Sequence, residues 1–234
     1  MPSLSAEWGA GRNRGLPHGA RTRTLRAGEA RVNDGIDWDQ ATAEATEILR
    51  EYLRIDTSNP PGNEGLAVEF LARILGSAGI PFEVAESAPG RSNLLARIGP
   101  SERVVTLLSH TDVVPVERQY WDVDPFGGEL RDGFLYGRGA LDMKGMGVIE
   151  LMAFLLLKRQ GVALRRGVAF VAMADEEAGS DHGATWLAEN RPDWLTSELV
   201  INEGAYGLAS SDGAGFVFQA AVSEKVPVWV ELSV

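Results

Sequence analysis

A histidine and an aspartate directly follow an apolar run in the middle of the chain, and their spacing could serve metal chemistry. The run Val104–Leu108 is apolar or β-branched, which predicts a buried strand, and His110 and Asp112 come just after it. Residues two apart in an extended segment share one face, so imidazole and carboxylate would lie together. A metal ligand oriented by a carboxylate has this form. A capped strand end with a solvated histidine explains the same residues equally well.

A lone aspartate, Asp142, follows a glycine-rich turn and precedes the apolar run Val148–Leu157, which predicts a helix. Gly137, Gly139 and Gly145 would let the backbone adopt positive φ or approach another group closely. Taken alone, Asp142 is better interpreted as a helix N-cap, worth about 1 kcal/mol. A nucleotide loop is disfavoured, because the turn lacks the third glycine of GxGxxG and the sequence has no GxxxxGK[ST] motif.

Carboxylates follow two further apolar runs. The segment Val168–Ala174 predicts a buried strand that leads into Asp175-Glu176-Glu177, and Glu203 follows the strand-like run Leu199–Asn202. Three consecutive carboxylates repel one another unless a cation offsets their charge. A solvated acidic loop remains the alternative for this segment.

The ends of these predicted strands can converge on one edge of a sheet, where open α/β folds bind ligands. One histidine with several carboxylates and no cysteine suits zinc, cobalt or manganese. An aspartate between two ions is the usual bridge in sites whose metals lie about 3.5–4 Å apart. A serine triad is disfavoured, because no GxSxG motif appears and the histidines are limited to His18, His110 and His182.

The composition narrows the class of protein. The chain has 234 residues, a formal net charge of −11 and no cysteine. The negative charge argues against a nucleic-acid surface, and the lack of cysteine excludes disulfides and thiolate zinc sites. Met1–Arg31 differs from the rest, with six arginines against two glutamates, little apolar periodicity and no signal-peptide core. We therefore expect residues 1–36 to form a disordered Arg/Gly-rich tail.

Alternating helical and strand-like segments would position the polar residues, which predicts an α/β fold. The helix Val148–Leu157 is too short to span a membrane. Further helices are predicted over Asp39–Leu53, Glu64–Ala78 and Ala184–Glu189. Further strands are predicted at Phe82–Ala85, Asn93–Ile98, Phe216–Ala221 and Val226–Val234, with a long loop at Val116–Phe134.

Four ordered blocks, SHTDVVP, GRGALDMKGMG, ADEEAGS and INEGAYG, resemble the M20 family of dinuclear zinc peptidases and amidohydrolases. The resemblance covers about Asp37 to Val234. It implies a mixed, largely parallel central sheet flanked by helices, as in zinc exopeptidases, with the start of an α+β lid domain at the C-terminus. Residues 37–222 would then be the N-terminal part of the catalytic domain, and residues 223–234 the first strand of the lid.

The resemblance also implies a set of metal ligands. His110 and Glu203 resemble ligands of one metal, Glu177 resembles a ligand of the second, and Asp142 resembles the bridging aspartate. The implied cofactors are two divalent ions, zinc first, with cobalt or manganese as alternatives.

Two further carboxylates have implied roles in catalysis. Glu176 resembles the general base, and Asp112 resembles the carboxylate that orients His110. The resemblance implies a hydrolase that uses a metal-activated water to cleave a peptide or amide bond next to a free carboxylate. It would be an exopeptidase or an N-acyl-amino-acid deacylase. A non-catalytic fragment of the same fold that binds a metal or small molecule is the alternative.

The same interpretation predicts the partners and the location. We expect a peptide or N-acyl amino acid as substrate, no nucleic acid, no membrane, a cytoplasmic location, and a lid domain that would allow a homodimer. The family's distal metal-binding histidine and the lid beyond its first strand have no counterpart in the sequence, so we expect an N-terminal fragment with little activity. His182 lies in the turn Gly179–Gly183, where we expect an exposed loop histidine without a metal.

Overall fold

The computed structural model describes residues 35–204, 208–209 and 216–217 of the chain. The predicted tail lies outside these residues except for its last two positions. The predicted strand Val226–Val234 and the lid segment 223–234 lie outside them entirely.

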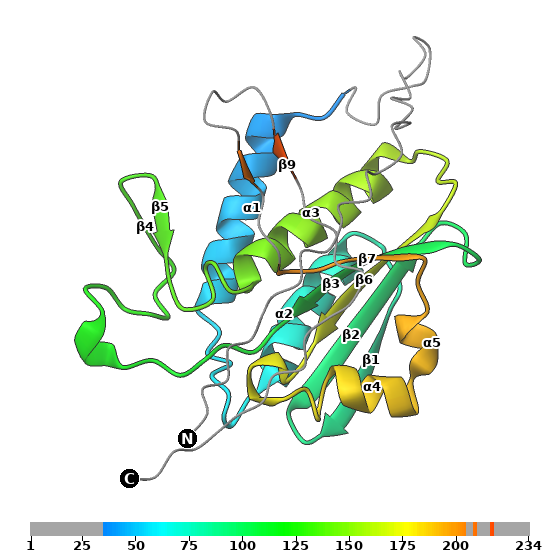
Figure 1. The fold of residues 1–234 in the computed structure, drawn as a ribbon. Helices are drawn as coiled ribbons and strands as arrows, with labels where there is room; N and C mark the ends of the chain where they lie inside the picture. Colours follow the sequence, from blue (N-terminus) through cyan, green and yellow to red (C-terminus); the bar gives the residue numbers. More distant parts are fainter. Residues whose placement is uncertain (1–34, 205–207, 210–215, 218–234) are drawn as a thin grey trace, which may run out of the picture. The chain divides into compact units, whose positions relative to one another are not determined.

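The described residues form a five-stranded mixed sheet with helices packed on both faces (Figure 1). The strand order is β1-β2-β6-β3-β7. The pairs β1·β2 and β2·β6 are antiparallel, whereas β6·β3 and β3·β7 are parallel, so the predicted mixed sheet is confirmed. The strands are β1 (Phe82–Ala88), β2 (Arg91–Ile98), β3 (Val104–His110), β6 (Gly167–Met173) and β7 (Leu199–Ile201).

Helices and smaller elements complete the described fold. The α-helices are α1 (Trp38–Leu53), α2 (Glu64–Ser77), α3 (Lys144–Gln160), α4 (Ala184–Asn190) and α5 (Pro192–Leu195). Two 3₁₀ turns lie at Arg118–Tyr120 (η1) and Glu176–Ala178 (η2). Two short antiparallel pairs join β4 (Glu129–Arg131) to β5 (Phe134–Tyr136) and β8 (Leu208–Ala209) to β9 (Phe216–Val217).

The central strand β6 separates two apolar cores. Phe170 and Ala172 lie in the core that includes residues of α1, α2 and α3. Val171 and Met173 point to the opposite face, where they join Leu187 of α4 and Trp194 of α5. A strand covered on both faces contains an unbroken apolar run rather than an alternating one, which explains why this strand was recognisable in the sequence.

The helix α3 is longer than the predicted Val148–Leu157, because its first turn has no apolar pattern. Its first residue, Lys144, is fully buried, and its ammonium donates hydrogen bonds to the carbonyl oxygens of Tyr52 (3.3 Å) and Ile55 (2.6 Å). These carbonyls lie at the end of α1 and just beyond it, where carbonyl groups lack helical partners and favour a cation. Lys144 therefore fixes the start of α3 against α1.

The prediction of a long loop over Val116–Phe134 was wrong in part. The segment contains η1 and β4 and leads into β5. Asp132 and Gly133, between the two strands, both have positive φ, at 53° and 82°. An Asp-Gly pair in this conformation makes a tight hairpin turn that matches the twist of its strands.

None of the helices in the described ranges is both long enough and apolar enough to cross a membrane.

Candidate metal centre

The register of the parallel strands brings the predicted polar clusters to one edge of the sheet. β3 pairs with β6 so that His110 lies opposite Met173, and the Thr111 N–H donates to the Met173 carbonyl at 2.8 Å. β7 pairs with β3 on the other side, with Ile201 opposite Leu107. The residues that follow all three strands therefore emerge together, as expected for the carboxyl ends of parallel strands.

His110 lies at the centre of this edge, and its side chain is 2% exposed. Its Nε2 atom is 3.1 Å from Asp142 Oδ1 and 3.3 Å from Glu203 Oε1. Its Nδ1 atom is 3.0 Å from the Asp112 carbonyl oxygen and 3.3 Å from Asp112 Oδ1. One ring nitrogen is thus fixed by Asp112 while the other points to two carboxylates. The alternative of a solvated histidine is wrong.

Asp112 also connects the end of β3 to the turn after β6. Its carboxylate is fully buried and accepts the backbone N–H groups of Glu176 and Glu177, each at 3.1 Å. It accepts a third hydrogen bond from Asn59 Nδ2 at 2.8 Å. One carboxylate therefore sets the position of the imidazole and of both glutamates.

Among the described residues, two groups of side chains that include His110 could each hold a cation. The first adds Asp142 and Glu177, and the second adds Glu176 and Glu203; within each group the ligand atoms lie within 4.8 Å of one another. One imidazole nitrogen with carboxylate oxygens is a donor set that suits zinc, cobalt or manganese. The structure thus brings together all four residues predicted as metal ligands. The residues present fit a divalent ion.

The electrostatics of the site also favour a cation. Burial raises the pKa of Glu176 and of Glu177, and neighbouring carboxylates add to this effect, while His110 opposes it. Burial lowers the pKa of His110, but hydrogen bonds with Asp112 and Glu203 outweigh burial and raise it to about 11. A metal ion at Nε2 would therefore compete with a proton, so its binding should release one.

Two sequence-based interpretations need correction. The N-cap position of α3 is occupied by Met143, so the interpretation of Asp142 as the helix cap was wrong. His182 is partly buried rather than exposed, with its Nδ1 3.1 Å from Ser87 Oγ and its backbone N–H donating to Asp175 at 3.0 Å. Among the described residues, His182 belongs to neither group that contains His110.

Sequence reasoning missed a buried set of residues behind the site. Asp175 was grouped with the two glutamates that follow it, but its carboxylate accepts hydrogen bonds from Asn59 and Arg91, at 2.8 and 2.7 Å. Arg91 also binds Glu64, which is fully buried. The available signal was weak, because Asn59 lies in a Pro/Gly-rich turn and Arg91 lies between the two predicted strands Phe82–Ala85 and Asn93–Ile98.

Several known proteins are similar to this chain. A model of the peptidase family M20/M25/M40 matches residues 106–224. Aminoacylase-1 of Sus scrofa is 36% identical over 192 residues, which are 80% of this chain and 46% of the aminoacylase. A succinyl-diaminopimelate desuccinylase of Methylorubrum populi is 42% identical over 149 residues, which are 61% of this chain and 38% of that enzyme.

The solved structure of human carnosine dipeptidase 1 has a similar fold. It is 24% identical, with a TM-score of 0.58 over 70% of this chain and 39% of that protein. The chain spans about half the length, or less, of the curated relatives that it matches.

Proposed function

Because the chain belongs to the peptidase family M20/M25/M40, we propose that it carries the metal-binding part of a hydrolase. The hydrolase would cleave a peptide or amide bond next to a free carboxylate. Its substrate would be a small peptide or an N-acyl amino acid. The names of the similar aminoacylase and desuccinylase support an acyl-amine bond of this kind.

The ligand assignment follows the positions of the side chains around His110. We assign His110, Asp142 and Glu203 to one ion, since both carboxylates approach the same ring nitrogen. We assign Asp142 and Glu177 to a second ion, with Asp142 shared. When bound, zinc, or cobalt or manganese in its place, would supply Lewis acidity and lower the pKa of water from about 15.7 towards 7.

Two carboxylates would have roles other than metal binding: Glu176 would transfer a proton, and Asp112 would position other groups. Glu176 would accept a proton from the attacking water and donate it to the leaving amine nitrogen. Its raised pKa, caused first by burial, brings it closer to the range in which a carboxyl group can do both. Asp112 would hold the His110 ring and the backbone of Glu176 in position.

The proposal includes the finer expectations about the whole protein. These are a catalytic domain that includes residues 37–222, a lid that begins within residues 223–234, a homodimer through that lid, and a cytoplasmic location. The single observation that carries the proposal is the buried His110 ring, with Nε2 facing two carboxylates and Nδ1 facing Asp112.

The test is hydrolysis of dipeptides and N-acyl amino acids by the full-length protein with and without zinc. Metal-dependent release of a free amino acid from one of the two substrate classes is expected. Zinc binding without hydrolysis of either class would favour the alternative, a non-catalytic binding protein of the same fold.

A further inference from the structure

Three buried carboxylates lie directly behind the candidate metal centre. The side chains of Glu64, Asp112 and Asp175 each offer an oxygen within 4.8 Å of the others, and all three residues are almost fully buried. Carboxylates this close require positive charge or hydrogen-bond donors. The side-chain donors are Arg91 and Asn59, and the backbone N–H groups of residues 175, 176, 177 and 182 donate further hydrogen bonds to the three carboxylates.

The Arg91 guanidinium supplies positive charge to two of the three carboxylates, those of Glu64 and Asp175. Its Nε and Nη2 atoms donate to the two carboxylate oxygens of Glu64, both at 2.7 Å, and Nη2 also donates to Asp175 Oδ1 at 2.7 Å. The guanidinium side chain is 13% exposed, whereas that of Glu64 is 0% exposed and that of Asp175 is 5% exposed. A planar guanidinium matches a carboxylate with two parallel hydrogen bonds, which a lysine cannot do.

Asp175 transmits this anchoring to the residues of the proposed active site. Its backbone is in the left-handed region, with φ of 67°, which costs free energy unless contacts fix it. Its backbone N–H donates to Glu64 at 3.2 Å, and its carboxylate accepts from the backbone N–H of His182. Glu176 and Glu177 follow immediately, so the direction of both side chains depends on how Asp175 is held.

Asn59 links the same network to the imidazole. Its Nδ2 atom donates both to Asp175 and to Asp112, each at 2.8 Å. The loop that carries Asn59 also closes over the ion pair, because a Cβ on Gly62 would lie 2.5 Å from Arg91 Nε and 2.7 Å from Glu64 Oε2. The backbone at Gly62 (φ of 107°) thus packs directly on the guanidinium.

We propose that Arg91, held by Glu64, is a positioning residue that fixes the turn 175–177 so that Glu176 and Glu177 face His110. It acts through Asp175, and among the described residues its side chain donates hydrogen bonds to Glu64 and Asp175 rather than to a proposed metal ligand. The inference rests on the proposed function only in one respect, the identity of the ion that Glu177 and its neighbours would bind.

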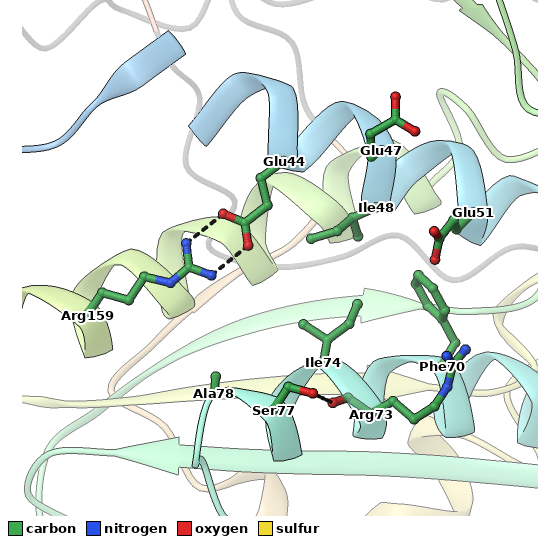
Figure 2. A pocket seen from close by; sticks show the side chains of 10 residues that line it. All are labelled: Glu44, Glu47, Ile48, Glu51, Phe70, Arg73, Ile74, Ser77, Ala78 and Arg159. Atoms are coloured by element: carbon green, nitrogen blue, oxygen red, sulfur yellow. Dashed lines mark hydrogen bonds and ion pairs between the residues drawn. The ribbon is translucent and has the colours of Figure 1, made fainter. Parts of the chain in front are cut away.

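The chain offers a control in a second Arg–Glu pair with two hydrogen bonds, which is more exposed than the first. Arg159 of α3 donates to both oxygens of Glu44 of α1, each at 2.6 Å, as Figure 2 shows. This pair borders a cavity of about 500 Å³ whose lining includes Ile48 and Ile74. Neither the pair nor the cavity lining shares a residue with the candidate cation groups among the described residues. Breaking it tests for the general effect of losing an Arg–Glu pair.

The experiment compares wild type, Arg91→Lys, the double variant Arg91→Met/Glu64→Met and the control double variant Arg159→Met/Glu44→Met. Amide hydrogen exchange in the metal-free protein reports on Glu176 and Glu177, whose N–H groups bind Asp112. Cobalt titration, followed by visible absorption, reports on the affinity and geometry of the metal site. The Met/Met variants leave no charge of the pair unmatched, so a well-packed apolar replacement can keep the fold. Asp175 loses its arginine in the Arg91 variant but keeps hydrogen bonds from Asn59 and from the His182 N–H.

We expect both Arg91 variants to exchange the two amides at least about ten-fold faster, relative to amides of α1, and to bind cobalt about 10–100-fold more weakly. The control should change neither quantity. Unchanged exchange and unchanged cobalt affinity in the Arg91 variants would overturn the inference. If Arg91→Met/Glu64→Met does not fold, Arg91→Lys decides by the same criteria. A wild type that binds no cobalt would contradict the proposed function, while the exchange rates would still test Arg91.

Discussion

In each of two arginine–glutamate pairs of this molecule the guanidinium donates to both carboxylate oxygens, but the pairs lie in different surroundings. The Arg159–Glu44 pair joins two helices at the surface, with side chains 46% and 32% exposed. The Arg91–Glu64 pair lies behind the candidate metal centre, with side chains 13% and 0% exposed. Only the buried pair shares its guanidinium with a third carboxylate, that of Asp175.

The comparison indicates that the contribution of an Arg–Glu pair to stability depends on its burial and on its hydrogen bonds to other residues, rather than on the ion pair alone. An exposed pair contributes about 0–1 kcal/mol, because water screens both charges and two long side chains lose freedom. In a buried pair, removal of one partner leaves a desolvated charge and costs about 3–5 kcal/mol. The buried pair is also continuous, through Asp175 and Asn59, with the residues around His110.

The largest effect is expected at the proposed base. Replacing Glu176 with Ala should lower kcat of the full-length enzyme by about 10²–10⁴-fold and leave the metal content intact, because a general base is lost but no ligand. The control is Glu47→Ala at the surface cavity, which should leave kcat unchanged. Activity of Glu176→Ala within a few-fold of wild type would show that the base is another residue.

The next largest effect is on the free energy of unfolding, which should fall by different amounts when the Arg91–Glu64 pair and the Arg159–Glu44 pair are broken. Arg91→Met should lower the free energy of unfolding by about 3–5 kcal/mol, since Glu64 and Asp175 lose their cation in a buried site. Arg159→Met should lower it by less than about 1 kcal/mol. Urea unfolding of the metal-free variants measures both. Equal losses would contradict the distinction drawn from burial.

A pH-dependent effect is expected at Glu150, a buried carboxylate of α3 with no hydrogen-bond partner among the described residues. Burial, with repulsion from Glu203, raises the pKa of Glu150 from 4.5 to about 8. The folded protein keeps this proton where the unfolded chain has released it, so stability falls as pH rises from 4.5 to 8.

Glu150→Met should therefore be more stable than wild type at pH 8, by on the order of a few kcal/mol, and this advantage should shrink towards pH 4.5. Thermal unfolding across this range is the measurement. At the surface, Glu44→Gln provides the contrast, because the hydrogen bond from Arg159 lowers the pKa of Glu44. The stabilisation that Glu44→Gln removes should be small, fully present above pH 4.5, and lost only as the pH falls below 4.5 through the lowered pKa of Glu44. A pH-independent difference for Glu150→Met would show that Glu150 is already charged in the folded protein.

The smallest expected effect compares two glycines with positive φ. Gly62→Ala should cost about 1–3 kcal/mol, because the added Cβ meets both the Arg91 guanidinium and the Glu64 carboxylate. Gly161→Ala, after α3, should cost only about 1 kcal/mol, since the described residues leave space for a Cβ there. Chemical denaturation compares the two, and an equal cost would mean that the loop does not close tightly on the ion pair.

The metal centre was predictable where the signal is local. His110 and Asp112 stand out because an apolar strand ends in polar residues, and the parallel register then places Glu203 beside them. The supporting network was not predictable, because Glu64, Arg91 and Asp175 meet across 27 and 84 residues of sequence. Lys144 was missed for a similar reason, since its partners lie about 90 residues earlier, at the end of α1 and just beyond it.

Calorimetric zinc titration of the wild-type chain and of His110→Asn tests the central claim most directly. Three ligands, His110, Asp142 and Glu203, are assigned to one ion, whereas only Asp142 and Glu177 are assigned to the other. The account predicts about one tight zinc site per chain, with proton release on binding, and loss of that site in His110→Asn. Zinc binding that His110→Asn leaves unchanged, or two tight sites in this chain, would contradict it.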